Sequence, residues 1–162
     1  MDSREFESNN KFTVYKTGLE EILPVMQEVI SEGGKFSFFP LGNSMKPFIR
    51  AGKDSVHVVK ADAPEKYDIV LYRRMSGMFV LHRIVEVNDD GYVMCGDNQW
   101  TKEYGITGDM IIAKVSEIVR DGKAISCSSK KYMFWVHVWC DWFWLRRLYL
   151  KLRSTAKKLL KG

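Results

Sequence analysis

The pattern that most constrains this chain is a series of short apolar segments with a period of two. Seven such segments, separated by turn-forming residues, follow one another between residues 35 and 126. They cover residues 35–39, 55–60, 68–73, 78–87, 91–95, 110–119 and 123–126. Successive side chains on a strand point to opposite faces, so this period is typical of half-buried strands. Because no helices alternate with them, a parallel sheet is disfavoured, and we expect a mostly β fold: a compact antiparallel β-barrel or folded sheet.

Helical patterns flank the strands on both sides. Between residues 19 and 30, apolar residues recur at helical spacing, and Gly33 and Gly34 end the pattern. From residue 145 onward, apolar side chains fall within an arc of roughly 120° on a helical wheel, and cations fill the other side. Leu150 is the one clear exception to this division. We therefore expect a polar segment and helix (1–34), a β-rich domain (35–130) and an aromatic and basic amphipathic segment (131–162).

The positive charge of the chain is concentrated in its C-terminal part. Residues 131–162 carry eight Lys or Arg and one acid, whereas residues 1–130 carry 17 basic and 19 acidic side chains. A nucleic-acid-binding protein usually carries its basic surface on the folded body, so we expect no nucleic-acid partner. Four of the five tryptophans also fall between positions 135 and 144, and such rings beside a basic amphipath are typical of a membrane interface. We expect peripheral or monotopic attachment to an anionic membrane surface, with contacts from Trp139, Trp142, Trp144, Arg146 and Arg147.

The remaining composition narrows the class of protein further. Cys95, Cys127 and Cys140 are odd in number and widely spaced, so neither a disulfide framework nor a zinc site is expected. The first twenty residues are polar and acidic, which predicts no secretory signal peptide. The sequence contains no run of about 18 uncharged apolar residues, so we expect no membrane-spanning helix.

Three polar residues at the ends of expected strands occur in an order that suits nucleophilic catalysis. Ser44 lies in the loop G-N-S-M-K-P (42–47), His82 lies in the segment 78–87, and Asp97 lies in G-D-N (96–98). A serine hydroxyl needs a neighbouring base, and a neutral imidazole can act as one. Each motif alone is more typical of a turn or a structural histidine, so the hypothesis depends on their combination.

Taken together, these motifs resemble those of the type I signal peptidases and the related self-cleaving SOS repressors. The shared order is G-x-S-M-x-P at 42–47, D-I-V-L-Y at 68–72, H-R-I-V at 82–85 and G-D-N at 96–98, and the resemblance covers roughly residues 35–119. A histidine at position 82, where bacterial housekeeping enzymes carry lysine, is similar to the endoplasmic-reticulum, archaeal and sporulation-type branch. The resemblance implies a serine endopeptidase at a membrane, with Ser44 as nucleophile and His82 as base. Its substrate would be an extended peptide or preprotein, and neither a metal nor an organic cofactor is required.

The chain departs from the family pattern at several places. The family's usual serine or threonine two residues before the nucleophile is Gly42 here, which leaves the oxyanion to backbone groups, and we expect Gly42 and Met45 at the oxyanion site and substrate groove. The D-S-R stretch after G-D-N is missing, and Glu103 stands six residues beyond Asp97, where the histidine branch carries its acid. The residue that orients His82 is therefore Glu103 or Asp97, and we favour Glu103 as the orienting acid and Asp97 as structural support. Tyr67 replaces a usual glycine. The alternative function is a catalytically inactive peptide-binding or adaptor member of the same fold.

Overall fold

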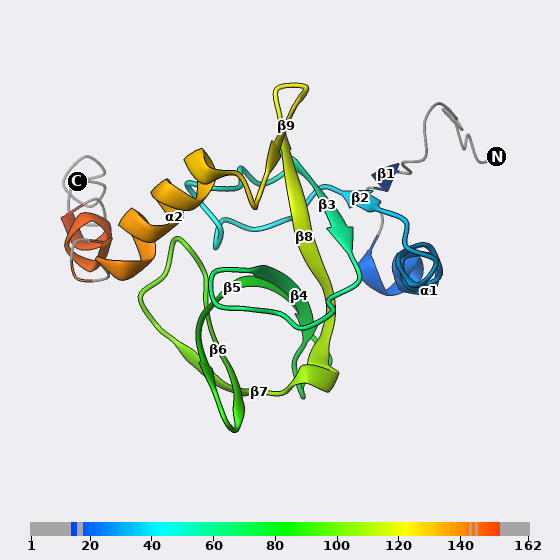
Figure 1. The fold of residues 1–162 in the computed structure, drawn as a ribbon, viewed down its shortest axis with the longest axis horizontal. Helices are drawn as coiled ribbons and strands as arrows, with labels where there is room; N and C mark the ends of the chain where they lie inside the picture. Colours follow the sequence, from blue (N-terminus) through cyan, green and yellow to red (C-terminus); the bar gives the residue numbers. More distant parts are fainter. Residues whose placement is uncertain (1–13, 16–17, 143, 145, 153–162) are drawn as a thin grey trace, which may run out of the picture.

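The computed structural model describes residues 14–15, 18–142, 144 and 146–152, and its main element is a folded, mostly antiparallel sheet (Figure 1). The strand order is β1-β2-β3-β8-β4-β5-β6-β7, and β9 pairs with β8. The strands are β1 (Val14–Tyr15), β2 (Phe36–Phe38), β3 (Ser55–Val59), β4 (Ile69–Arg73), β5 (Phe79–Asn88), β6 (Gly91–Cys95), β7 (Glu103–Ile106), β8 (Ile111–Arg120) and β9 (Lys123–Ser126). A short 3₁₀ turn, Gly108–Met110, precedes β8.

The sheet is not a closed barrel, so that part of the expectation is wrong. Closure would need hydrogen bonds between the two ends of the strand order, which are the two-residue β1 and the four-residue β7. Instead the sheet bends at irregularities in register, at His57/Val58 in the β3–β8 pair and at Leu71/Tyr72 in the β4–β8 pair. Such irregularities increase the local twist and bend a strand. The folded, mostly antiparallel sheet is confirmed, and the β1–β2 pair is parallel.

All seven predicted strands are present, with ends shifted by at most one residue. The sequence pattern missed β1 and β7. The segment that forms β7 contains Gly105 in a positive-φ conformation and has no alternating apolar side chains, so it lacks the local signal of a strand.

The N-terminal helix α1 (Leu19–Ser31) packs one face on the sheet beside β2. Its buried side chains are Ile22, Met26 and Ile30, which repeat at four-residue intervals and join the main core. Burial of each such side chain contributes about 1.5–3 kcal/mol. The chain leaves the helix through Gly33, whose φ of +80° favours glycine.

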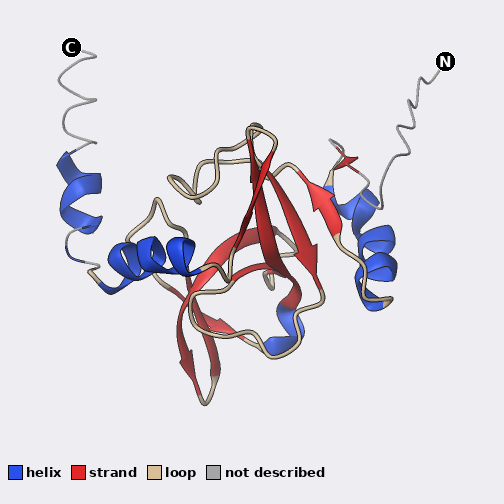
Figure 2. Ribbon diagram, turned by 45° about the horizontal axis from the view of Figure 1, so that its top comes forward, coloured by secondary structure: helices blue, strands red, loops and turns tan. Residues whose placement is uncertain are grey.

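The C-terminal helix α2 (Lys130–Asp141) lies on the opposite side of the sheet from α1 (Figure 2). Its first turn is capped by Ser129, whose side chain accepts a hydrogen bond from the Tyr132 N–H, and Tyr132 and Val136 are buried against the body. A second helical stretch covers residues 146–152. None of the helices among the described residues is long and apolar enough to cross a membrane.

The second stretch does not lie as the helical wheel predicts. Arg146 is 2% exposed and Leu150 is 7% exposed, so the face that carries both residues packs on the body. Leu148, Tyr149 and Leu152 are exposed. The prediction of Arg146 as a membrane contact is therefore wrong, and Leu150, the exception on the wheel, is the apolar residue of the buried face.

The five predicted membrane contacts thus divide into two groups. Trp139 is half-buried, and its indole N–H donates to the Asp97 carbonyl oxygen at 2.8 Å, so like Arg146 it serves the body of the protein. Trp142, Trp144 and Arg147 are exposed. The basic residues beyond position 152, on which the charge prediction partly depends, lie outside the described residues.

Candidate active site

Ser44 lies in the loop that connects β2 to β3. Met45 and Ile49 anchor this loop in the main core, where they are 4% and 2% exposed, and the Ile49 N–H donates to the Met45 carbonyl at 2.9 Å. Gly42 enters the loop with a φ of +84°, a conformation that favours glycine. The loop therefore holds Ser44 half-exposed on a buried base.

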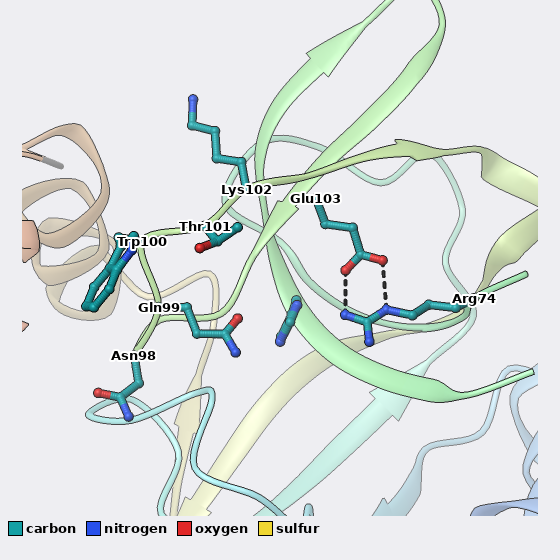
Figure 3. A pocket seen from close by; sticks show the side chains of 8 residues that line it. Arg74, Asn98, Gln99, Trp100, Thr101, Lys102 and Glu103 are labelled. Carbon is teal, nitrogen blue, oxygen red and sulfur yellow. Dashed lines mark hydrogen bonds and ion pairs between the residues drawn. The ribbon is translucent and has the colours of Figure 1, made fainter. Parts of the chain in front are cut away.

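His82 lies on β5 and borders a cavity of about 490 Å³. Its side chain is 5% exposed. The other residues around this cavity come from the position just after β4, from the segment between β6 and β7, and from the start of β7 (Figure 3): Arg74, Asn98, Gln99, Trp100, Thr101, Lys102 and Glu103. Two strand ends and one connecting segment thus surround the imidazole.

A tyrosine hydroxyl connects His82 to Glu103. The Tyr72 hydroxyl donates to Glu103 Oε2 at 2.7 Å and lies 3.3 Å from His82 Nδ1. Since the hydroxyl has one proton and gives it to the carboxylate, its oxygen is left to accept from the imidazole. This assigns the proton of neutral His82 to Nδ1 and leaves the lone pair on Nε2, the tautomer that a general base needs.

Glu103 is held ionised by Arg74. The guanidinium donates to both carboxylate oxygens at 2.7 Å, and this hydrogen bonding lowers the pKa of Glu103 (Figure 3). Burial lowers the pKa of His82 to about 4, although the nearby Glu103 charge acts in the opposite direction. The imidazole is therefore neutral at neutral pH, beside a carboxylate that can stabilise it once it is protonated.

Gly96 brings the serine loop and the imidazole together. A Cβ atom on Gly96 would lie 2.8 Å from the Ser44 carbonyl oxygen and 3.0 Å from His82 Nε2. The first contact, with a backbone oxygen, is too close for any Cβ atom, and the second is tighter than ordinary contacts, so position 96 favours glycine because of this approach. No hydrogen bond between the Ser44 hydroxyl and His82 is present in the described structure, which is common in unliganded sites.

Asn98 fixes the serine loop to the G-D-N turn. Its backbone N–H donates to the Ser44 carbonyl at 2.7 Å, and its side-chain Nδ2 donates to the Asn43 carbonyl at 3.0 Å. Neither the Ser44 nor the Met45 N–H donates a hydrogen bond to an acceptor among the described residues. Backbone donors of this kind can stabilise an oxyanion.

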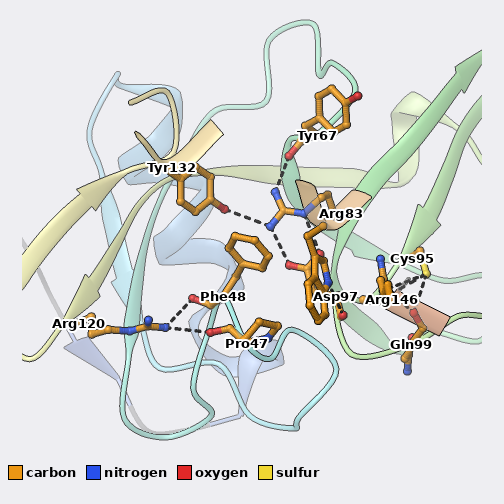
Figure 4. A network of polar contacts seen from close by, with 12 residues as sticks. Pro47, Phe48, Tyr67, Arg83, Cys95, Asp97, Gln99, Arg120, Tyr132 and Arg146 are labelled. Carbon is orange, nitrogen blue, oxygen red and sulfur yellow. Dashed lines mark hydrogen bonds and ion pairs between the residues drawn. The ribbon is translucent and has the colours of Figure 1, made fainter. Parts of the chain in front are cut away.

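Asp97 has a structural partner (Figure 4). Both of its carboxylate oxygens accept from Arg83, at 2.9 and 2.7 Å, and both side chains are fully buried. The same guanidinium donates to the Tyr67 carbonyl and the Tyr132 hydroxyl and lies 4.9 Å from the Phe48 ring. As an orienting group for His82, Asp97 is therefore the wrong choice, because Arg83 occupies both of its oxygens.

A groove runs from Ser44 along the edge of β5. Residues Phe79 to Arg83 pair with β4, whereas pairing with β6 begins only at Arg83, so the other edge of β5 from Phe79 to His82 carries no strand in the described structure. A cavity of about 120 Å³ lies at this edge. Its lining is Pro40, Leu41, Gly42, Ser44, Met45, Ile49, Phe79, Val80 and Leu81. Gly42 and Met45 line this cavity together with Ser44, and their role at an oxyanion site and substrate groove stays a prediction.

The sequence analysis did not assign a role in this site to Tyr72 or to Asn98. Tyr72 and His82 are diagonal neighbours across the β4–β5 pair, because Tyr72 pairs with Val80 and side chains two apart on a strand share a face. The tight turn before β5, in which the Arg74 N–H donates to the Met78 carbonyl, would have fixed that register. Asn98 was visible only as part of a motif.

The chain matches no known protein family, no curated protein and no solved structure. Among the described residues, no three His, Cys, Asp or Glu side chains are grouped closely enough to hold a metal ion.

Proposed function

We propose that this protein is a serine endopeptidase of the signal-peptidase type. The observation that carries the proposal is the approach of the Ser44 loop and His82 to Gly96: a Cβ atom on Gly96 would lie 2.8 Å from the Ser44 carbonyl oxygen and 3.0 Å from His82 Nε2. The resemblance of the motifs and the Nδ1-protonated tautomer of His82 support the same chemistry.

In this mechanism Ser44 is the nucleophile, and His82 acts in turn as base and as acid. His82 Nε2 takes the proton from the Ser44 hydroxyl as the oxygen attacks the scissile carbonyl. The N–H groups of Ser44 and Met45 stabilise the oxyanion. Imidazolium formation is stabilised by the Tyr72 hydroxyl and the Glu103 charge, and His82 then passes the proton to the leaving amine. A water molecule, deprotonated by His82, releases the acyl group from Ser44.

The substrate in this proposal is an extended peptide that adds a strand to the free edge of β5. Such an edge offers unpaired backbone N–H and C=O groups, and peptide recognition by strand addition depends on them. Small side chains beside the cut suit the cavity of about 120 Å³ next to Ser44.

An active-site serine probe tests this proposal. We expect a fluorophosphonate to label the wild-type chain, and we expect Ser44→Ala and His82→Ala to abolish both labelling and cleavage of a peptide library. Ser76→Ala, in an exposed turn, is the matched control and should label normally. Labelling that survives in Ser44→Ala would refute the assignment of the nucleophile.

Two observations favour a second candidate, a peptide-binding domain of the same architecture without turnover. The pKa of His82, about 4, lies well below the near-neutral value that suits a general base, and Gly42 provides no side-chain oxyanion donor. Peptide binding that persists in a chain resistant to the serine probe would identify this function.

We further propose that the C-terminal segment attaches the protein to an anionic membrane surface. Trp144, Leu148 and Leu152 are 67%, 48% and 62% exposed, so apolar side chains face away from the body, while Arg147 and Lys151 flank them. Aromatic and aliphatic groups of this kind enter the acyl boundary, and the cations meet anionic headgroups. The full chain should therefore sediment with phosphatidylserine vesicles and remain in solution with phosphatidylcholine alone.

A further inference from the structure

The C-terminal helical region contacts the body at the turn that carries the G-D-N motif. The Trp139 indole N–H donates to the Asp97 carbonyl at 2.8 Å. The Arg146 guanidinium donates to the carbonyls of Gly96 and Gln99 and approaches the Cys95 thiol at 3.3 Å (Figure 4). Two side chains from this region therefore donate hydrogen bonds to three carbonyl groups of one turn, those of Gly96, Asp97 and Gln99.

The same turn determines where the serine loop lies. Asn98 donates to the carbonyls of Ser44 and Asn43, and both the Ser44 carbonyl and His82 Nε2 lie close to Gly96. A shift of this turn would move the nucleophile relative to the base, because the hydrogen bonds join the two segments directly.

The burial of Arg146 is difficult to explain by membrane attachment alone. A buried guanidinium requires hydrogen-bond partners to offset the loss of water, and here the partners are carbonyl groups of the G-D-N turn. Arg147, the next residue, remains exposed. The chain thus directs one of two adjacent arginines inward, onto the turn.

We propose that Trp139 and Arg146 are positioning residues, which hold the turn so that Ser44 lies in register with His82. The inference rests on the proposed peptidase function and adds that the C-terminal helical region is part of the catalytic framework as well as an attachment surface. Neither side chain contacts the reacting groups.

Conservative variants of the full chain test the proposal without vesicles. Trp139→Phe keeps an aromatic ring but removes the indole donor. Arg146→Lys keeps the charge but removes Nη2, the nitrogen that contacts both carbonyl groups and the Cys95 thiol. We expect kcat to fall about tenfold in each, with KM within twofold, because small misplacements of reacting groups lower the rate more than the affinity. Trp135→Phe, on the exposed side of α2, is the matched control and should leave both constants unchanged.

Hydrogen exchange at the Asn98 amide separates this inference from the peptidase proposal. This N–H donates a hydrogen bond to the Ser44 carbonyl oxygen. We expect the amide to exchange at least about fivefold faster in Trp139→Phe and in Arg146→Lys than in Trp135→Phe. The comparison requires that the three variants have the same global stability in urea. Unchanged exchange in both variants, or faster exchange with unchanged kcat, would overturn the inference. If the wild-type chain neither labels nor cleaves, the peptidase proposal fails, whereas unequal exchange would still support the positioning of the turn.

Discussion

His82 makes the stability of the folded protein depend on pH in a defined direction. Burial lowers its pKa from the ordinary 6.5 to about 4 in the folded protein, so protons bind the unfolded chain more readily. The contribution of His82 to the free energy of unfolding is therefore fully present above pH 6.5 and is lost as the pH falls toward 4. At about 1.4 kcal/mol per pKa unit, the loss between pH 7.5 and pH 5 is about 2 kcal/mol.

Urea denaturation followed by tryptophan fluorescence at pH 7.5, 6 and 5 measures this loss. With a slope of about 2 kcal/mol per molar urea, the wild-type midpoint should fall by about 1 M over this range. His82→Gln should show a much smaller fall, because its side chain does not titrate, whereas His137→Gln, a change at an exposed histidine on α2, should behave as the wild type does. An equal fall in the wild type and in His82→Gln would refute the reasoning. The same pKa predicts that kcat/KM stays flat between pH 7 and pH 5.

Three further predictions follow from the site and its supports. Asp97→Asn should lower the free energy of unfolding by about 3–5 kcal/mol, because the Arg83 charge stays buried without its partner. The double variant with Arg83→Met should recover part of this loss, and an Asp97→Asn cost below about 1 kcal/mol would contradict a structural role of the Arg83–Asp97 pair. Tyr72→Phe should lower kcat about 10- to 100-fold, equivalent to about 1.5–3 kcal/mol for hydrogen bonds to a charged group, and an unchanged kcat would exclude the hydroxyl as the link to Glu103. The double variant Trp144→Ser/Leu152→Ser should reduce sedimentation with phosphatidylserine vesicles about tenfold or more without changing the urea midpoint, and equal sedimentation would place the attachment surface elsewhere.

Much of the sheet was predictable because its signals are local. Alternation within a strand and glycine or aspartate in the turns depend on neighbouring residues alone, and all seven strands inferred from them are present. Closure into a barrel depends on which edges meet, and that is decided by contacts between residues distant in sequence. The bounds of β7 depend in the same way on its partner β6.

The candidate site likewise has residues that local sequence motifs predict and residues that only long-range contacts bring in. Ser44, His82 and Glu103 were predicted from motif order and spacing, whereas Tyr72, which lies between the last two, carries no motif of its own and becomes visible only once β4 and β5 are paired in register. The helical wheel grouped Arg146 with the other cations because a wheel contains no information about the surface against which a helix packs. The carbonyl groups of the G-D-N turn, which bind Arg146, are main-chain atoms and leave no trace in side-chain patterns.

His82 and Arg83 are consecutive on β5, and their side chains therefore serve opposite faces of one strand. A slip of β5 against β4 by a single position would exchange their surroundings, with a cation in the cavity beside Glu103 and an imidazole under α2. Altering the length of the connection between Arg73 and Phe79 should thus abolish activity outright. Altering the tip of the hairpin between Asn88 and Gly91 should be tolerated, since the irregular pairing at Ile84/Glu86 lies between that tip and both side chains and can absorb the change.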